Sequence, residues 1–144
     1  MNKKILIPLD GSPYSEVVLP HALSLAKLEK AEIVILRVPV VPAREFFGRD
    51  AAMASKITSE IDEESDRYVK DKVKRLGRQS IKVTGMIREG PVADTIVEVA
   101  DEIHADMIAM STHGRKGIQH WLKGSMAEDI VHHTHIPTIL IDPN

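Results

Sequence analysis

The chain has 144 residues, of which 43% are hydrophobic and 28% are charged, and its formal net charge is -2. This length and composition suit one globular domain with a single hydrophobic core. No long basic run is present, so nucleic acid and anionic membranes have no electrostatic basis for binding. The absence of cysteine excludes a disulfide framework, a thiolate nucleophile and an iron–sulfur cluster.

The N-terminus carries basic residues followed by a short apolar run that ends at Pro8. This run is too short for a signal peptide or for a helix that crosses a membrane. We therefore expect a cytoplasmic protein without a membrane partner.

The first predicted elements are a strand over residues 5–9 and a helix over 14–29, in which apolar residues recur with helical spacing. Ser12 can cap this helix, and Pro13 suits its first position. Pro20 lies inside the segment, where its ring and its missing N–H predict a kink.

The second strand is predicted over residues 32–38, and the prolines after it lead the chain out of the sheet. A long charged helix over 51–76 then ends at Gly77. The remaining elements, in chain order, are a strand over 80–88, a helix over 92–103, a strand over 106–110, a loop over 111–123, a helix over 124–132 and a strand over 138–141.

Strands and helices therefore alternate, and apolar strands joined by helices indicate a parallel sheet that is covered on both faces. Right-handed connections predict an α/β fold in one domain over residues 1–144, with a single doubly wound, five-stranded parallel sheet ordered 3-2-1-4-5. In this order the winding reverses between the first and fourth strands. Ligands of such sheets bind there, beyond the carboxyl ends of the strands.

Two loops meet at this switch point, namely Asp10-Gly11-Ser12 and residues 111–123. The second loop leads into the helix that begins at Gly124 and Ser125, and the free N–H groups of a helix N-terminus favour phosphate. Neither a G-x-G-x-x-G turn nor a P-loop is present. From the spacing alone, a phosphate site and an ordinary glycine loop with a helix cap both remain open.

Four segments are distinctive: the start of the chain up to Asp10-Gly11-Ser12, then Leu36-Arg37-Val38, residues 87–91, and Met110 to Gly114 followed nine residues later by Gly124-Ser125. They resemble segments of the universal stress protein family, and the match to this family covers nearly the whole chain. The first segment resembles the family's opening strand and acidic turn.

The last segment resembles the motif of the family's ATP-binding branch, which is Gly, two residues, Gly, nine residues, then Gly-Ser or Gly-Thr. Gly114, Gly124 and Ser125 keep this spacing, whereas Ser111 stands in place of the first glycine. The serine adds a side chain where the resemblance places ribose or phosphate.

The resemblance implies ATP, with Mg²⁺, as the ligand. Asp10 would accept hydrogen bonds from ribose hydroxyls or help to hold the metal, and capping of the first helix is its alternative role. Val38 would meet adenine through its backbone. The implied contact residues are Pro8, Asp10, Val38, Met110, Ser111, Gly114, Gly124, Ser125 and Met126.

The final strand, residues 138–141, is apolar and β-branched, and it lies at an edge of the predicted sheet. Pairing with the same strand of a second copy would satisfy its free backbone groups. Universal stress proteins commonly form dimers in this way, so the resemblance supports a homodimer. We expect either Leu140→Lys or Ile139→Pro to convert the homodimer to monomers.

Histidines offer weaker candidates. His113 and His120 flank the proposed phosphate loop, where they could contact phosphate or act as ordinary surface residues. His132, His133 and His135 could bind a metal, although their spacing matches no standard site and histidine also suits a helix C-terminus.

Three classes of function remain after these observations. The leading hypothesis is an ATP-binding regulatory protein of the stress response with little or no catalytic turnover. The alternatives are a slow ATPase or kinase-like enzyme and a ligand-free dimeric interaction module. No dedicated set of catalytic residues is visible in the sequence.

Overall fold

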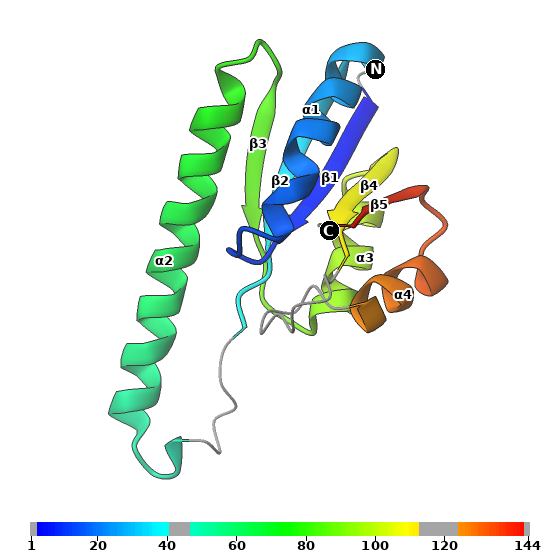
Figure 1. The fold of residues 1–144 in the computed structure, drawn as a ribbon. Coiled ribbons are helices and arrows are strands. Elements are labelled where there is room, and N and C mark those ends of the chain that lie inside the picture. The colour runs from blue at the N-terminus through cyan, green and yellow to red at the C-terminus, as the bar shows by residue number, and fades with distance from the viewer. Residues whose placement is uncertain (1–2, 41–46, 113–123, 143–144) are drawn as a thin grey trace.

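The computed structural model describes residues 3–40, 47–112 and 124–142 (Figure 1). Its elements, in chain order, are β1 (Lys3–Leu9), the 3-10 turn η1 (Ser15–Val17), α1 (Val18–Glu29), β2 (Ala31–Arg37), α2 (Ala51–Gly77), β3 (Val83–Ile87), α3 (Val92–Glu102), β4 (Met107–Ser111), α4 (Gly124–His133) and β5 (Thr138–Ile141).

The strands form one five-stranded sheet in the order β3-β2-β1-β4-β5, and every pair of neighbours is parallel. This topology confirms the predicted doubly wound fold. Strands β1 and β4 are neighbours at the centre, with Ile5 opposite Met107. Their carboxyl ends therefore lie side by side at the predicted switch point.

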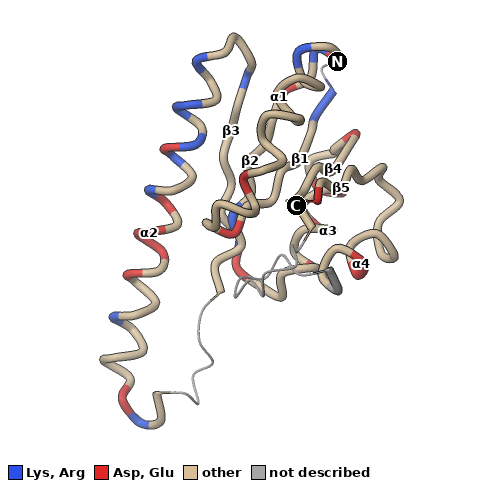
Figure 2. The backbone as a smooth tube through the Cα atoms, in the orientation of Figure 1, with Lys and Arg blue, Asp and Glu red and all other residues tan. Residues whose placement is uncertain are grey.

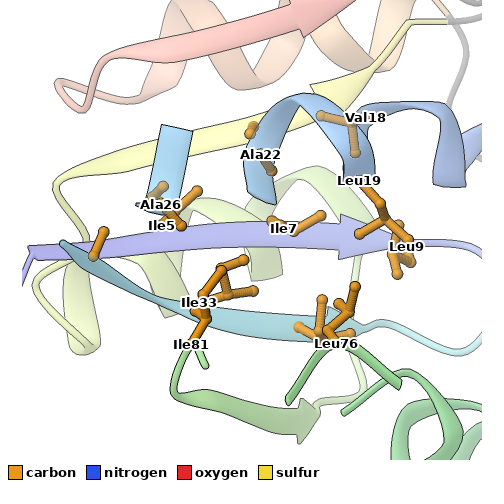
Figure 3. Close-up of a cluster of buried hydrophobic side chains, with 13 residues drawn as sticks. Ile5, Ile7, Leu9, Val18, Leu19, Ala22, Ala26, Ile33, Leu76 and Ile81 are labelled. Atoms are coloured by element: carbon orange, nitrogen blue, oxygen red, sulfur yellow. The ribbon is translucent and has the colours of Figure 1, made fainter. Parts of the chain in front are cut away.

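Alternate strand residues enter two separate hydrophobic clusters, one on each face of the sheet. Leu6 and Leu36 pack with α3 and α4, whereas Ile7 and Ile35 pack with α1 and the end of α2. Figure 3 shows the second cluster around β1 and β2. Burial on both faces explains why these strands read as continuous apolar runs.

The first helix begins later than predicted. The segment after Ser12 forms the 3-10 turn η1, and the α-helix starts only at Val18. In a continuous α-helix the ring of Pro20 would meet the carbonyl of Glu16, so the tighter turn accommodates it. Pro20 thus lies in the first turn of α1, where N–H groups have no partner within the helix.

The third strand begins at Val83 rather than at residue 80. Ser80 has a φ of 62°, and the Gln79 N–H donates to the Leu76 carbonyl at 3.2 Å. These residues form the turn after α2, because a positive φ is incompatible with a strand. The described part of the chain contains no helix that is long and apolar enough to cross a membrane.

Helix α2 comes unusually close to strand β3 at Gly85. A Cβ atom added there would lie 2.3 Å from Cγ1 of Val69 and 3.0 Å from Cγ2 of Val73. Both neighbours are β-branched and stiff, so a side chain at this position has to displace the helix. Glycine therefore sets the height of α2 above the edge of the sheet.

We expect Gly85→Val to lower the free energy of unfolding by about 1–3 kcal/mol through overpacking against α2. Urea denaturation measures this change. Thr84→Val is the matched control, because Thr84 is exposed and its side chain points to the other face of β3. Equal stability of the two variants would show that α2 adjusts without cost.

Candidate functional site

The carboxyl ends of β1, β2 and β4 bring together three of the predicted site residues. Asp10 follows β1, Val38 follows β2, and Ser111 ends β4. The site therefore forms at the point where the winding of the sheet reverses.

The Asp10 side chain is buried, with 3% of its surface exposed. Its Oδ1 accepts hydrogen bonds from the backbone N–H of Ser12, at 2.8 Å, and from the Ser12 hydroxyl. Its Oδ2 is buried and has no partner among the described residues. One carboxylate oxygen thus holds the loop, and the other remains available.

The Asp10 carboxylate does not cap the first helix, because Ser12 and Ser15 fold the start of this segment. The Ser12 Oγ accepts the N–H of Ser15 at 3.2 Å, in the turn that leads into η1. The helical cap predicted for Ser12 is not formed, because the N-cap residues of η1 and α1 are Tyr14 and Val17, and neither makes a side-chain capping bond. The Ser15 hydroxyl donates to the Ser12 carbonyl at 2.8 Å. The two serines therefore hold this turn together, and the second Asp10 oxygen is left for another partner.

Ser111 is fully buried, and its hydroxyl points toward the start of α1. The hydroxyl accepts the N–H of Val18 at 3.1 Å and donates to the Ser15 carbonyl at 3.1 Å. It therefore satisfies one of the free N–H groups at the beginning of the helix. The added side chain thus ties β4 to α1, and its hydroxyl is already engaged on both sides.

The other predicted contact residues divide into three groups. Pro8, Val38 and Met110 are buried within or next to the strands, so they can offer only backbone groups to a ligand. Gly124 opens α4 and Ser125 follows it, while the partly buried Met126 packs against the α3–α4 cluster. Gly114, like His113 and His120, lies outside the described residues.

Arg37, at the end of β2, links the site to α2 in a way that the sequence did not predict. Its Nη2 lies 3.0 Å from Glu64 Oε2, and its guanidinium carbon lies 5.0 Å from the centre of the Tyr68 ring. A Cβ atom added at Gly11 would lie 2.6 Å from Nη1 of Arg37. The guanidinium is therefore packed against the backbone of the Asp10 loop.

Two features favour glycine at position 11. Its φ is 90°, in the region that side chains disfavour. A Cβ atom there would also have to displace the guanidinium end of Arg37. The loop geometry that orients Asp10 thus depends on glycine and on the neighbouring arginine together.

A second polar contact joins η1 to α2. The Tyr68 hydroxyl donates to Glu16 Oε2 at 2.6 Å, and Lys72 Nζ lies 2.8 Å from Glu16 Oε1. Burial, and next the hydrogen bond to Glu16, raise the pKa of Tyr68 above its ordinary value. Tyr68 therefore stays protonated and donates, which fixes the 3-10 turn against the helix.

Buried polar atoms without a partner gather at this end of the sheet. Within the described ranges they are Asp10 Oδ2, Nε and Nη1 of Arg37, and Ser65 Oγ. Leaving such groups unpaired is costly, so they usually mark a place that water or a ligand completes. Asp10 and Arg37 flank one loop, which identifies that loop as the polar centre of the site.

The histidines near the C-terminus show no metal site within the part of the chain that the structure describes. His132 and His133 are exposed at the end of α4, and Nδ1 of His133 lies 2.7 Å from the carbonyl of Asp129. No group of three potential ligand side chains occurs there.

The fold and the site together define a class of protein: a doubly wound α/β protein with a polar site at the switch point of its sheet. Residues 1–142 match the model of the universal stress protein family. The chain belongs to the universal stress protein family.

Relatives of known sequence or structure agree with this assignment. Universal stress protein MJ0531 of Methanocaldococcus jannaschii is 34% identical over 140 residues, which cover 96% of this chain and 81% of MJ0531. The solved structure of MJ0577 from the same organism superposes with a TM-score of 0.81 at 25% identity, covering 99% of this chain and 96% of that one. A universal stress protein of Archaeoglobus fulgidus, solved in complex with dAMP, has the same fold, with a TM-score of 0.61 at 19% identity, covering 98% of each chain.

Proposed function

We propose that this protein binds ATP, together with Mg²⁺, and that it acts as a cytoplasmic regulator in the stress response with little or no turnover. The proposal rests on the site at the switch point of the sheet. It also includes a homodimer formed through β5.

The single observation that carries the proposal is the free Oδ2 atom of Asp10. It is a buried carboxylate oxygen without a described partner, at the place where doubly wound sheets bind their ligands. A ribose hydroxyl would donate to this oxygen, and a magnesium ion would accept it as a hard ligand. Either partner would remove the cost of leaving the oxygen unpaired.

The remaining contacts come from backbone groups and therefore need no particular side chain. Val38 follows β2 and would offer its N–H and carbonyl to adenine. The start of α4 at Gly124 and Ser125 would offer N–H groups to the phosphates. The relative that was solved with dAMP supports an adenine nucleotide as the class of ligand.

Calorimetric titration with ATP and magnesium tests the proposal directly, and we expect saturable binding. Gly124→Val should abolish it, because a β-branched side chain obstructs the approach of phosphate to the start of α4. The thermal stability of this variant, measured without nucleotide, controls for damage to the fold. A flat titration of the wild-type protein at millimolar ATP would exclude the function.

An enzymatic role is the second candidate, and the measured turnover separates it from binding alone. The polar centre of the site offers Asp10 and Arg37, but phosphoryl transfer also needs a residue that positions the nucleophile. We therefore expect ATP hydrolysis far below the roughly 1–100 per second of kinases. Hydrolysis within that range, lost in Asp10→Ala, would identify an enzyme instead.

A further inference from the structure

Helix α2 is tied at two places to the segment that carries Asp10. The helix runs beside β2 and β3 and continues past their carboxyl ends (Figure 1). At the first place, the guanidinium of Arg37 separates α2 from the backbone of Gly11, because a Cβ atom added there would lie 2.6 Å from Nη1 of Arg37. At the second place, Glu16 of η1 accepts the Tyr68 hydroxyl at 2.6 Å. Both contacts adjoin the polar centre of the proposed nucleotide site.

The guanidinium of Arg37 is held by α2 rather than by the strands. Its Nη2 lies 3.0 Å from Glu64 Oε2, and its central carbon lies 5.0 Å from the centre of the Tyr68 ring. Its Nε and Nη1 are buried and have no partner among the described residues. Within the described part of the chain, Glu64 is thus the acidic residue that pairs with Arg37. The place of the guanidinium therefore depends on α2.

This ion pair joins a buried group to an accessible one. The Arg37 side chain is 11% exposed, whereas the Glu64 side chain is 49% exposed. Acidic residues occupy the middle of α2, and basic residues gather toward its C-terminal end (Figure 2). Asp66, in the same acidic part of the helix, pairs instead with Lys70 of α2 at 2.8 Å. A substitution at Glu64 can therefore change how Arg37 is held without removing a buried side chain.

We propose that Arg37 is a positioning residue of the nucleotide site, and that Glu64 and Tyr68 of α2 set its place. The guanidinium supports the backbone of Gly11, and this support fixes the direction of the free Oδ2 of Asp10. Arg37 acts through the loop rather than on the ligand itself. The inference rests on the proposed nucleotide function and extends it, because it makes α2 a determinant of nucleotide affinity.

Positioning and simple attraction of charge predict opposite results at Glu64. ATP is a polyanion, so the loss of a nearby carboxylate charge strengthens its binding where Coulomb attraction decides. Loss of positioning weakens binding instead, because Arg37 is no longer held against the loop. Glu64→Gln is therefore expected to weaken ATP binding by about two- to fivefold, which is the range for a partly exposed ion pair.

Calorimetric titration with ATP and magnesium measures this change, and Asp66→Asn is the matched control. This variant removes a carboxylate charge from an exposed ion pair on the same helix and leaves the pair between Arg37 and Glu64 in place. We expect it to bind ATP at least as tightly as the wild type does. Thermal denaturation without nucleotide shows that each variant is folded at the temperature of the titration.

Two substitutions of Arg37 separate its shape from its charge. Arg37→Met removes both, and we expect it to weaken ATP binding by about tenfold. Arg37→Lys keeps the charge but loses the planar group that packs on Tyr68, so it should recover only part of the affinity. Glu64→Gln should have little further effect in the Arg37→Met protein, because Glu64 acts through the guanidinium.

Several results would overturn this inference and leave the nucleotide function intact. They are wild-type affinity in Arg37→Met, tighter binding by Glu64→Gln, and additive effects of these two substitutions. Full recovery of affinity in Arg37→Lys would show that only the charge of residue 37 matters. A flat titration of the wild-type protein would instead exclude the nucleotide function and this inference together.

Discussion

Asp10→Asn is expected to weaken ATP binding by about 10- to 100-fold, and to change the free energy of unfolding by less than about 1 kcal/mol. The asparagine oxygen can still accept the two hydrogen bonds that Ser12 donates to Oδ1. The amide nitrogen then replaces the charged Oδ2, which has no partner among the described residues. Hydrogen bonds to a charged group contribute about 1.5–3 kcal/mol, and the expected loss of affinity follows from that range.

Calorimetry with ATP measures the affinity, and thermal denaturation without nucleotide measures the stability. Ser12→Ala is the informative companion, because it keeps the carboxylate but removes the hydroxyl that orients it. We expect Ser12→Ala to lower stability more than Asp10→Asn does. If Asp10→Asn binds ATP as tightly as the wild type, the aspartate only shapes the loop and the ligand lies elsewhere.

The arrangement of the fold could be predicted because it depends on patterns that are local in the sequence. The strands are apolar on both faces, and helices separate them, so the order of the sheet follows from the handedness of the connections. The last strand was predicted at its observed limits, Thr138–Ile141. The predicted starts of two elements were wrong, because backbone conformation determines them. These are the third strand, where Ser80 has a positive φ, and the first helix, which starts late to accommodate Pro20.

The polar contacts of the site could not be predicted, because they join residues that lie far apart in the chain. The Ser111 hydroxyl donates to the Ser15 carbonyl 96 positions away, and Arg37 reaches Glu64 across 27 positions. No periodicity or spacing indicates such pairs. The sequence placed Arg37 in a strand and in the segment Leu36-Arg37-Val38 that resembles the family, but it did not predict that the guanidinium packs against the glycine of the acidic loop.

The register of β5 also changes the best test of the proposed dimer. The Ile108 N–H donates to the Pro137 carbonyl at 2.9 Å, and the Thr112 N–H donates to the Ile141 carbonyl at 2.8 Å. In a parallel pair with this register, the N–H and C=O groups of Ile139 and Ile141 point toward β4. Those of Thr138 and Leu140 point toward the free edge of the sheet. Ile139→Pro, which the sequence suggested, would therefore damage the sheet itself.

Leu140→Pro is instead expected to convert the dimer to a monomer of 16.0 kDa while the fold is retained. Proline at this position removes an N–H group that faces a second copy and leaves the pairing with β4 intact. Ile139→Pro, one residue away, is the contrasting control. It leaves the carbonyl of the buried Ile108 unpaired, so we expect a loss of about 1–3 kcal/mol in the free energy of unfolding. Light scattering gives the mass and urea denaturation gives the stability. A Leu140→Pro protein that remains dimeric at micromolar concentration would place the interface away from β5.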